Sequence, residues 1–267
     1  MAAPKKLTSV ALRERKGEKI AAVTAYDVAF ARLADRAGVD VVLVGDSLGM
    51  VVQGLGNTLP VTLDEMIYHC RMVARGVEHA HVVADMPFGS YQASVEDGVR
   101  AAGRLLKEGA AEAVKLEGGA EVAELVARLV TIGIPVMGHV GMTPQSVHKF
   151  GGFKLQGRSE AQARTIAAGA RAIADAGVYA MVLESIPSAL AVEITTAVPV
   201  PTIGIGAGPS CDGQVLVMHD LLGLDPEWSP RFARRYAELG RAAQKAFADY
   251  AADVRAGQFP SKKESFS

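Results

Sequence analysis

Apolar runs recur along the chain, and each ends in a polar residue followed by a loop. The clearest is Val41–Val44, four aliphatic residues that lead to Asp46 and Ser47. An apolar run without polar interruption is typical of a strand that is covered on both faces, as strands of parallel sheets are. Other runs of this kind end at Asp85, Glu117, His139 and Glu184.

The full pattern predicts eight strands, with helices between most of them. We expect the strands at residues 19–26, 41–44, 81–85, 113–117, 135–140, 179–184, 200–205 and 214–218. Helix starts are marked by residues whose side-chain oxygen can cap a first turn, which are Asp27, Thr62, Ser94 and Ser159. Ser229 and Pro230 predict the start of a long C-terminal helix, because proline is favoured at the first helical position.

Strands that alternate with helices indicate an α/β protein, and the arrangement predicted here is a single (β/α)8 TIM barrel. The barrel would carry an N-terminal extension and the long C-terminal helix, with a tail that frays from about residue 257. The 267 residues suit one such domain and no linker divides them, so we expect one domain over residues 1–267. A doubly wound open sheet is the alternative.

Composition and charge argue against several classes of partner and location for this chain. The net charge is −1 and no basic block occurs, so neither nucleic acid nor a membrane is the expected partner. Residues 1–19 lack the apolar core of a secretory signal, and no run approaches the roughly 20 apolar residues that span a bilayer. The two cysteines, Cys70 and Cys211, are far apart in sequence, which favours unpaired thiols and a cytoplasmic location.

Lys115 and Glu117 alternate with Val114 and Leu116, so the two pairs point to opposite faces of one strand. The apolar pair would meet helices, which places Lys115 and Glu117 inside the barrel near its mouth. Burying such groups without partners costs several kcal/mol, so they require an ion pair, a metal or a charged substrate. A purely structural ion pair between the two is the simpler alternative.

Asp46, Asp85 and Glu117 end three strands that a barrel places next to one another. Converging carboxylates repel one another unless a cation lies among them, and oxygen ligands favour a hard ion such as Mg²⁺. The three residues therefore predict a Mg²⁺ site. Taken singly, Asp46 or Asp85 could instead cap the following loop or helix.

Glu184 is the candidate general acid or base, because partial burial at a strand end would raise its pKa. An ion pair with a basic residue of a neighbouring loop is the alternative. His139 could hydrogen-bond a substrate oxygen or could satisfy groups of the core.

Two loops are candidates for ligand contact. The glycines of residues 204–208 could let the backbone approach a ligand, and the loops after strands seven and eight bind phosphate in many barrels. These glycines could equally serve only a tight turn. Residues 141–158 are glycine-rich and long, as lids and binding loops often are.

Six segments resemble the signatures of the ketopantoate hydroxymethyltransferase family. They are VGDSLGM at 44–50, DMPFGSY at 85–91, VKLEGG at 114–119, MGHVG at 137–141, GIGAG at 204–208 and DGQ at 212–214. The similarity runs in order from about Leu7 to Phe247, and these positions show no departure from the family pattern. The resemblance implies a (β/α)8 barrel of the phosphoenolpyruvate mutase and isocitrate lyase type.

The resemblance also implies an activity. The family transfers a hydroxymethyl group from 5,10-methylenetetrahydrofolate to α-ketoisovalerate (3-methyl-2-oxobutanoate) through a Mg²⁺-stabilised enolate. The product is ketopantoate, on the route to pantothenate and coenzyme A. The family forms large rings, often decamers, so a homo-oligomer is expected.

The matching motifs assign roles to individual residues by resemblance. The expected Mg²⁺ ligands are Asp46 and Asp85, with Glu117 bound directly or through water. The expected keto-acid ligands are Ser47, Lys115 and His139, together with the metal ligands Asp46 and Asp85. Glu184 is the expected catalytic acid–base residue.

Three other hypotheses fit parts of the sequence. Lys115 could act as a Schiff-base nucleophile, as lysines on barrel strands can. The chain could be a Mg²⁺-dependent carbon–carbon or carbon–phosphorus lyase or aldolase acting on a 2-oxo acid. Such relatives commonly place a catalytic cysteine or another gating-loop motif after strand four, where this chain has residues 118–120, Gly-Gly-Ala. A non-catalytic barrel is disfavoured by the polar residues at the strand ends.

Overall fold

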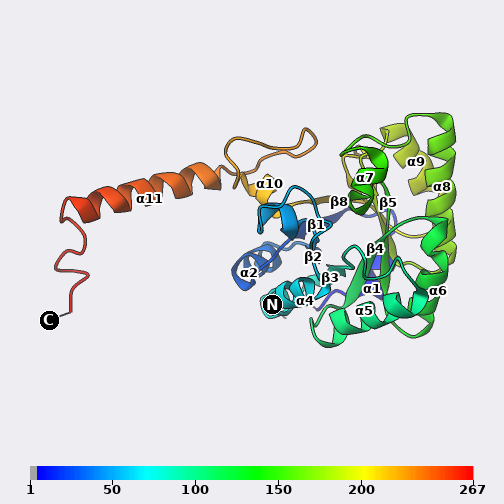
Figure 1. The fold of residues 1–267 in the computed structure, drawn as a ribbon, viewed down its shortest axis with the longest axis horizontal. Coiled ribbons are helices and arrows are strands. Elements are labelled where there is room, and N and C mark those ends of the chain that lie inside the picture. Colours follow the sequence, from blue (N-terminus) through cyan, green and yellow to red (C-terminus); the bar gives the residue numbers. More distant parts are fainter. Residues whose placement is uncertain (1–4, 267) are drawn as a thin grey trace. The chain divides into compact units, whose positions relative to one another are not determined.

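The computed structural model describes residues 5–266, and its central feature is a closed barrel of eight parallel strands (Figure 1). The strands are β1 (Ile20–Thr24), β2 (Val41–Val44), β3 (His81–Asp85), β4 (Ala113–Glu117), β5 (Val136–Gly141), β6 (Ala180–Glu184), β7 (Thr202–Ile205) and β8 (Gly213–Leu216). Each strand pairs with the next along the chain, and β8 pairs with β1. The predicted TIM barrel is confirmed, and the open doubly wound sheet is wrong because the sheet closes on itself.

Helices cover the outer face of the barrel. The helical elements up to the last strand are α1 (Ser9–Glu14), α2 (Val28–Arg36), α3 (Leu48–Val51), α4 (Leu63–Ala74), α5 (Val95–Lys107), η1 (Ala120–Val122), α6 (Ala123–Thr131), η2 (Pro144–Ser146), α7 (Val147–Phe150), α8 (Glu160–Asp175) and α9 (Ser188–Ala197). In Figure 1, α5 lies beside β4, and α6 and α8 lie beside β5, in agreement with their packing contacts. Residues 141–158, predicted as one long loop, contain the two short helices η2 and α7.

The predicted helix caps are present. The Asp27 carboxylate accepts hydrogen bonds from the backbone N–H groups of Ala29 and Phe30. Thr62 and Glu65 form a reciprocal capping box at the start of α4. Ser94 and Ser159 each accept a bond from the backbone N–H three residues later. Local side-chain chemistry therefore sets where these helices begin.

The barrel interior is apolar toward the N-terminal ends of the strands and polar at their C-terminal ends. On β4, Ala113 belongs to the apolar interior, and Lys115 and Glu117 follow it on the same face. The interior cluster consists of Leu12, Ile20, Val41, Leu43, Val83, Ala113, Met137, Tyr179, Ala180, Val182, Ile203, Ile205 and Val215. These packed apolar side chains lie toward the N-terminal ends of the strands and fix the positions of the polar C-terminal ends.

Packing divides the chain after Val217 into two compact units, and the complete barrel lies in the first. The expectation of one domain over residues 1–267 stays a prediction. The second unit begins with α10 (Met218–Leu222) and ends with α11 (Leu239–Arg255) and a short tail. Because α10 starts at Met218, β8 ends at Leu216, two residues before the predicted strand end.

The C-terminal helix starts at Leu239, so its predicted start at Ser229 and Pro230 is wrong. The guanidinium of Arg235 donates to the carbonyl oxygens of Asp225 and Trp228, both at 2.8 Å, and these bonds hold the preceding segment in a loop. Between residues 5 and 266, no helix has the length and apolar character needed to cross a membrane.

Candidate active site

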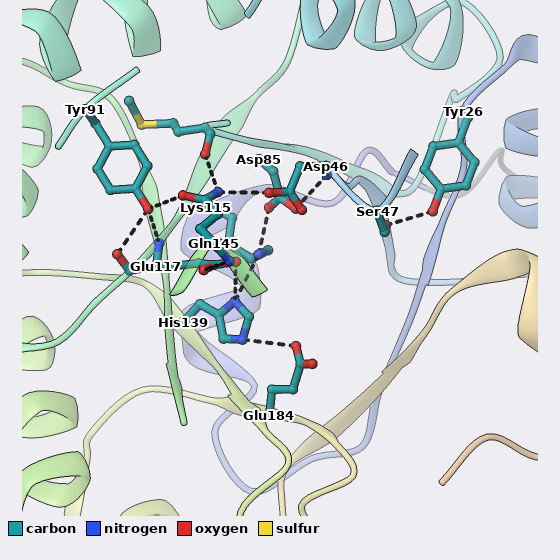
Figure 2. Close-up of polar contacts among 11 residues, drawn as sticks. Tyr26, Asp46, Ser47, Asp85, Tyr91, Lys115, Glu117, His139, Gln145 and Glu184 are labelled. Atoms are coloured by element: carbon teal, nitrogen blue, oxygen red, sulfur yellow. Dashed lines mark hydrogen bonds and ion pairs between the residues drawn. The ribbon is translucent and has the colours of Figure 1, made fainter. Parts of the chain in front are cut away.

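The polar residues predicted at the strand ends meet inside the mouth of the barrel (Figure 2). Strand register explains the meeting, because parallel pairing places Asp85 beside Lys115 and Glu117 beside His139. Asp46 follows β2, and Glu184 is the last residue of β6. Asp46, Asp85, Lys115, Glu117 and His139 are all buried.

Lys115 is central to the polar network. Its Nζ atom lies 2.8 Å from Oδ1 of Asp85 and 3.2 Å from Nδ1 of His139. The ion pair of Lys115 is therefore formed across two strands with Asp85, and not with Glu117 on the same strand, which was the alternative. An ammonium that donates to Nδ1 leaves the proton of the neutral imidazole on Nε2.

Burial and mutual repulsion perturb the carboxyl groups at this site. Burial raises the pKa of Asp46 to about 7, and the neighbouring charge of Asp85 contributes. Burial also raises the pKa of Glu117 well above its usual range, with Asp46 adding to the effect. Burial opposes the charge on Lys115, but Asp85, Glu117 and Asp46 outweigh it and raise the lysine pKa. Three carboxyl groups thus surround a single ammonium, and burial without a further cation favours the neutral form of Asp46 and Glu117.

The donor set fits a hard divalent cation such as Mg²⁺. Asp46 and Asp85 are adjacent, because the backbone N–H of Asp46 donates to Oδ2 of Asp85 over 3.1 Å. Across residues 5–266, no group of three or more His, Cys, Asp or Glu side chains is arranged so that it could hold a metal ion. Mg²⁺ commonly uses one or two carboxylates and retains several water ligands, so the Asp46 and Asp85 pair meets its needs. Their role as ligands, and that of Glu117, stays a prediction.

Gln145 and Tyr91 belong to the network, although sequence reasoning gave them no role. The side-chain amide of Gln145 donates to Oδ2 of Asp46 and to the carbonyl oxygen of Met86, both at 2.9 Å. The backbone N–H of Gln145 donates to Oε2 of Glu117 at 3.0 Å. The hydroxyl of Tyr91 lies 2.8 Å from Oε1 of Gln145. Gln145 therefore joins the segment after β5 to the carboxylates of β2 and β4.

The sequence signals for these two residues were weak. Tyr91 ends the segment DMPFGSY, and the family resemblance is the one signal that this segment carries. Gln145 lies in the long segment after β5, and nothing in its local sequence indicates that its side chain reaches Asp46. Its position depends on how that segment folds back across the barrel.

Glu184 contacts His139 and not a basic residue of a neighbouring loop. Oε2 of Glu184 lies 3.2 Å from Nε2 of His139. The Glu184 side chain keeps 16% of its surface exposed, whereas the His139 side chain keeps only 2%. Burial raises the pKa of Glu184 to about 7 and, with the charge of Lys115, lowers the pKa of His139. The geometry gives a carboxyl group that can exchange a proton near neutral pH, beside a neutral imidazole.

Ser47 lies on the other side of the carboxylates. Its Oγ atom is 2.9 Å from the hydroxyl of Tyr26, a residue at the end of the predicted first strand for which the sequence suggested no role. Burial raises the pKa of Tyr26, so its hydroxyl stays protonated. Tyr26 can thus fix the orientation of the Ser47 hydroxyl.

The glycines of residues 204–208 have a packing role. A Cβ at Gly208 would lie 2.3 Å from Oγ of Ser188, and its φ of +84° is a conformation that other residues rarely adopt. A Cβ at Gly204 would lie 3.0 Å from Sγ of Cys211. The tight-turn interpretation is therefore sufficient for this segment. Cys70 and Cys211 are both free and buried.

Comparison with known proteins identifies relatives over nearly the whole chain. The family model described as ketopantoate hydroxymethyltransferase matches residues 5–262. The 3-methyl-2-oxobutanoate hydroxymethyltransferase of Moorella thermoacetica is 59% identical over 96% of this chain and 95% of that protein. The enzyme of the same name from Syntrophotalea carbinolica is 57% identical over 94% of each chain.

Solved structures of more distant proteins share the fold. Phosphonopyruvate hydrolase in complex with oxalate and Mg²⁺ superposes with a TM-score of 0.62 at 17% identity, covering 97% of this chain and 93% of that one. A 2,3-dimethylmalate lyase, described as a member of the PEP mutase/isocitrate lyase superfamily, gives 0.59 at 18% identity, covering 97% and 91%. On the strength of the family model and the close relatives, the chain belongs to the ketopantoate hydroxymethyltransferase family.

Proposed function

We propose that this protein transfers a hydroxymethyl group from 5,10-methylenetetrahydrofolate to α-ketoisovalerate and so forms ketopantoate for pantothenate synthesis. The observation that carries the proposal is the contact between the partly exposed Glu184 and the buried His139 at the edge of the Asp46, Asp85 and Lys115 cluster. It joins an acid–base group to a site where carboxyl groups outnumber the single ammonium. Family membership supports the choice of substrates.

The keto acid would bind through its carboxylate and ketone oxygens. The ammonium of Lys115 and the hydroxyl of Ser47 offer donors to these oxygens, and Nε2 of His139 offers a third if the substrate displaces the Glu184 carboxylate from it. Mg²⁺ held by Asp46 and Asp85 would draw electron density from the ketone and so acidify the C3 proton. Glu117 would coordinate the Mg²⁺ ion directly or through a water molecule.

Glu184 would take the C3 proton. Its carboxylate form is the base, and its raised pKa makes the protonated form stable enough to return a proton later in the cycle. Before the keto acid binds, the contact with His139 would hold the carboxylate in one orientation. The carbanion equivalent formed at C3 then attacks the methylene carbon of the folate donor, and water supplies the hydroxyl group as tetrahydrofolate leaves.

Lys115 serves this mechanism as a cation. Asp85 lies 2.8 Å from its Nζ atom and holds the group protonated, whereas a Schiff-base nucleophile must be a free amine. Treatment with borohydride in the presence of α-ketoisovalerate is expected to trap no adduct on Lys115.

The decisive experiment follows the C3 proton of α-ketoisovalerate by proton NMR in D2O, with the protein, tetrahydrofolate and Mg²⁺. We expect loss of the C3 signal, and we expect a chelator to prevent that loss. Ketopantoate should appear when the methylene form of the donor is supplied. Absence of exchange under every condition would refute the transferase proposal and favour the alternative, a lyase acting on a 2-oxo acid.

We also propose that the chain works as a cytoplasmic homo-oligomer, as the family resemblance implies. Light scattering coupled to size-exclusion chromatography measures the assembled mass. A decamer is the expected size.

A further inference from the structure

A cavity of about 850 Å³ adjoins the site that was assigned to the keto acid. Its walls come from the loop between β3 and α5, the residues that follow β4, the segment after β5, and the N-terminal half of α8. The volume lies within the range of pockets that bind drug-sized ligands. A keto acid of five carbons would leave most of it unfilled.

The cavity and the polar site share a wall. Tyr91, Glu117 and Gln145 line the cavity and also take part in the hydrogen-bond network of the site. A ligand in the cavity would therefore contact three side chains of the site assigned to the keto acid. The second substrate of a group transfer has to lie beside the first, so the shared residues make this cavity a candidate location for it.

The wall facing α8 is shaped by two glycines. A Cβ at Gly119 would lie 2.9 Å from the Cα of Gly169, so the chain after β4 packs backbone to backbone against α8. Both glycines line the cavity, as do the rings of Phe88 and Phe150. Flat backbone and aromatic rings suit a planar, ring-shaped ligand.

A second cavity of about 490 Å³ continues the first and differs from it in charge. The two share Lys149, Phe150, Gln156 and Gln162. The second is lined by the cations Lys149, Lys154 and Arg158, and the residues described around it include no acidic side chain. It therefore suits the anionic end of a ligand.

The first cavity instead carries an acid at its edge. Glu121 follows the glycine pair of β4 and lines the cavity together with Glu117. A carboxylate can accept two parallel N–H donors, which the aminopyrimidinone edge of a reduced pterin provides. Among the described residues, acidic side chains line only the first cavity, and the second is lined by cations without an acid, which gives a long ligand a defined direction.

We propose that the two cavities together bind the reduced-pterin one-carbon donor, with its ring system in the first cavity and the carboxylates of its glutamate tail in the second. This inference rests on the proposed function and assigns a location to its second substrate. The ring system would then lie against Tyr91, Glu117 and Gln145, the residues that the cavity shares with the keto-acid site.

Filling the first cavity tests the position of the ring. Thr165 lines the cavity from α8 and is exposed, and its hydroxyl only returns a bond to the carbonyl oxygen of Ala161. Thr196 on α9 is a matched control, since it is also exposed and bonds the carbonyl oxygen of Val192. Neither residue belongs to the keto-acid site.

Binding of tetrahydrofolate and of α-ketoisovalerate with Mg²⁺ is measured by isothermal titration for the full chain and both variants. Thr165→Trp should weaken tetrahydrofolate at least 10-fold and leave the keto acid within 2-fold, whereas Thr196→Trp should change neither. Unchanged tetrahydrofolate affinity in Thr165→Trp overturns the location, as does failure of the unmodified chain to bind tetrahydrofolate. The proposed function has its own readout, metal-dependent C3 exchange by the unmodified chain, so the two failures are distinguishable.

The charge of the second cavity tests the direction of the ligand. The unmodified chain should bind tetrahydrofolate triglutamate at least 5-fold more tightly than the monoglutamate. The double variant Lys154→Ala, Arg158→Ala should lose this preference. The control is the double variant Lys107→Ala, Arg171→Ala, whose two positions line neither cavity, and it should retain the preference. A preference that persists in the first double variant places the tail elsewhere and overturns this half of the proposal.

Discussion

Nε2 of His139 lies 3.2 Å from Oε2 of Glu184, while Nδ1 of the same ring lies 3.2 Å from Nζ of Lys115. The imidazole thus stands between the proposed base and the ammonium that pairs with Asp85. Since Lys115 can only donate, the proton of the neutral ring lies on Nε2, the nitrogen nearer Glu184. Glu184 therefore contacts a group whose tautomer is fixed by Lys115.

Glu184→Gln should remove proton transfer without removing the site. Turnover should fall at least 100-fold, the low end of usual acid–base contributions. Binding of Mg²⁺ and α-ketoisovalerate should stay nearly intact, because neither is assigned to Glu184. Steady-state kinetics and isothermal titration check the two halves, with the exposed Glu193→Gln on α9 as control. Lost binding with normal turnover would refute the assignment.

The pH profile should report the raised pKa of Glu184. Burial raises this pKa to about 7, so the carboxyl group is protonated below pH 7 and cannot accept the C3 proton. The value of kcat/KM should fall about 10-fold per pH unit below that point and level off above it. Glu184→Gln should abolish this dependence in its residual activity. A profile that stays flat from pH 5 to pH 8 contradicts the role as base.

Mg²⁺ should stabilise the folded protein through Asp46 and Asp85. An ion that binds only the native state at 100 times its dissociation constant adds about 2.7 kcal/mol to the free energy of unfolding. Thermal unfolding with and without Mg²⁺ measures this gain. Asp85→Asn should lose most of it, whereas Asp97→Asn, at an exposed position on α5, should retain it. An equal Mg²⁺ response in both variants would remove Asp85 from the ligand set.

Asp35 should stabilise the barrel in a pH-dependent manner. Its carboxylate accepts hydrogen bonds from the backbone N–H groups of Glu78, His79 and Ala80 at 3.0, 2.9 and 2.7 Å. Burial opposes its charge, but these three bonds outweigh it and lower the pKa. Asp35→Ala removes the acceptor of three backbone donors, of which that of Ala80 is buried, and should cost about 3 kcal/mol at pH 7.

The sign of the pH effect follows from the lowered pKa of Asp35. A carboxyl group whose pKa is lower in the folded state contributes to the free energy of unfolding. The contribution is complete at pH values above the pKa of the unfolded state, which is about 3.9. This contribution declines as the pH falls through the folded value. Denaturant unfolding at several pH values should therefore show the difference between wild type and Asp35→Ala narrowing below about pH 4. A difference that widens in acid would contradict the charged role of Asp35.

The apolar stripe on α11 should contribute to assembly. Leu239, Phe247, Tyr250 and Val254 recur at helical spacing and are exposed, with 74% of Phe247 accessible. Phe247→Glu should lower the mass measured by light scattering, because a charge opposes burial of this face. Gln244→Glu, on the same helix and outside the stripe, should leave the mass unchanged. An unchanged mass in Phe247→Glu would exclude the stripe from the interface.

Local sequence patterns are enough to specify the strands, the faces of their residues and most of the polar residues at the barrel mouth. Uninterrupted apolar runs specify buried parallel strands, and the period of two places Lys115 and Glu117 on the interior face. Caps such as that formed by Thr62 and Glu65 act within one turn and are equally readable. These features depend only on residues close together in the chain.

Which polar side chains form ion pairs and hydrogen bonds with one another depends on the tertiary structure. Lys115 pairs with Asp85 because the register of β3 and β4 places them together, and register is set by packing of the whole barrel. Gln145 reaches Asp46, 99 positions away in sequence, only because the segment after β5 folds back over the mouth. The start of α11 is likewise fixed by the bonds that Arg235 makes to carbonyl groups up to 10 residues before it. A side chain's identity limits the bonds it can make, but which partner it finds depends on the path of the chain between them.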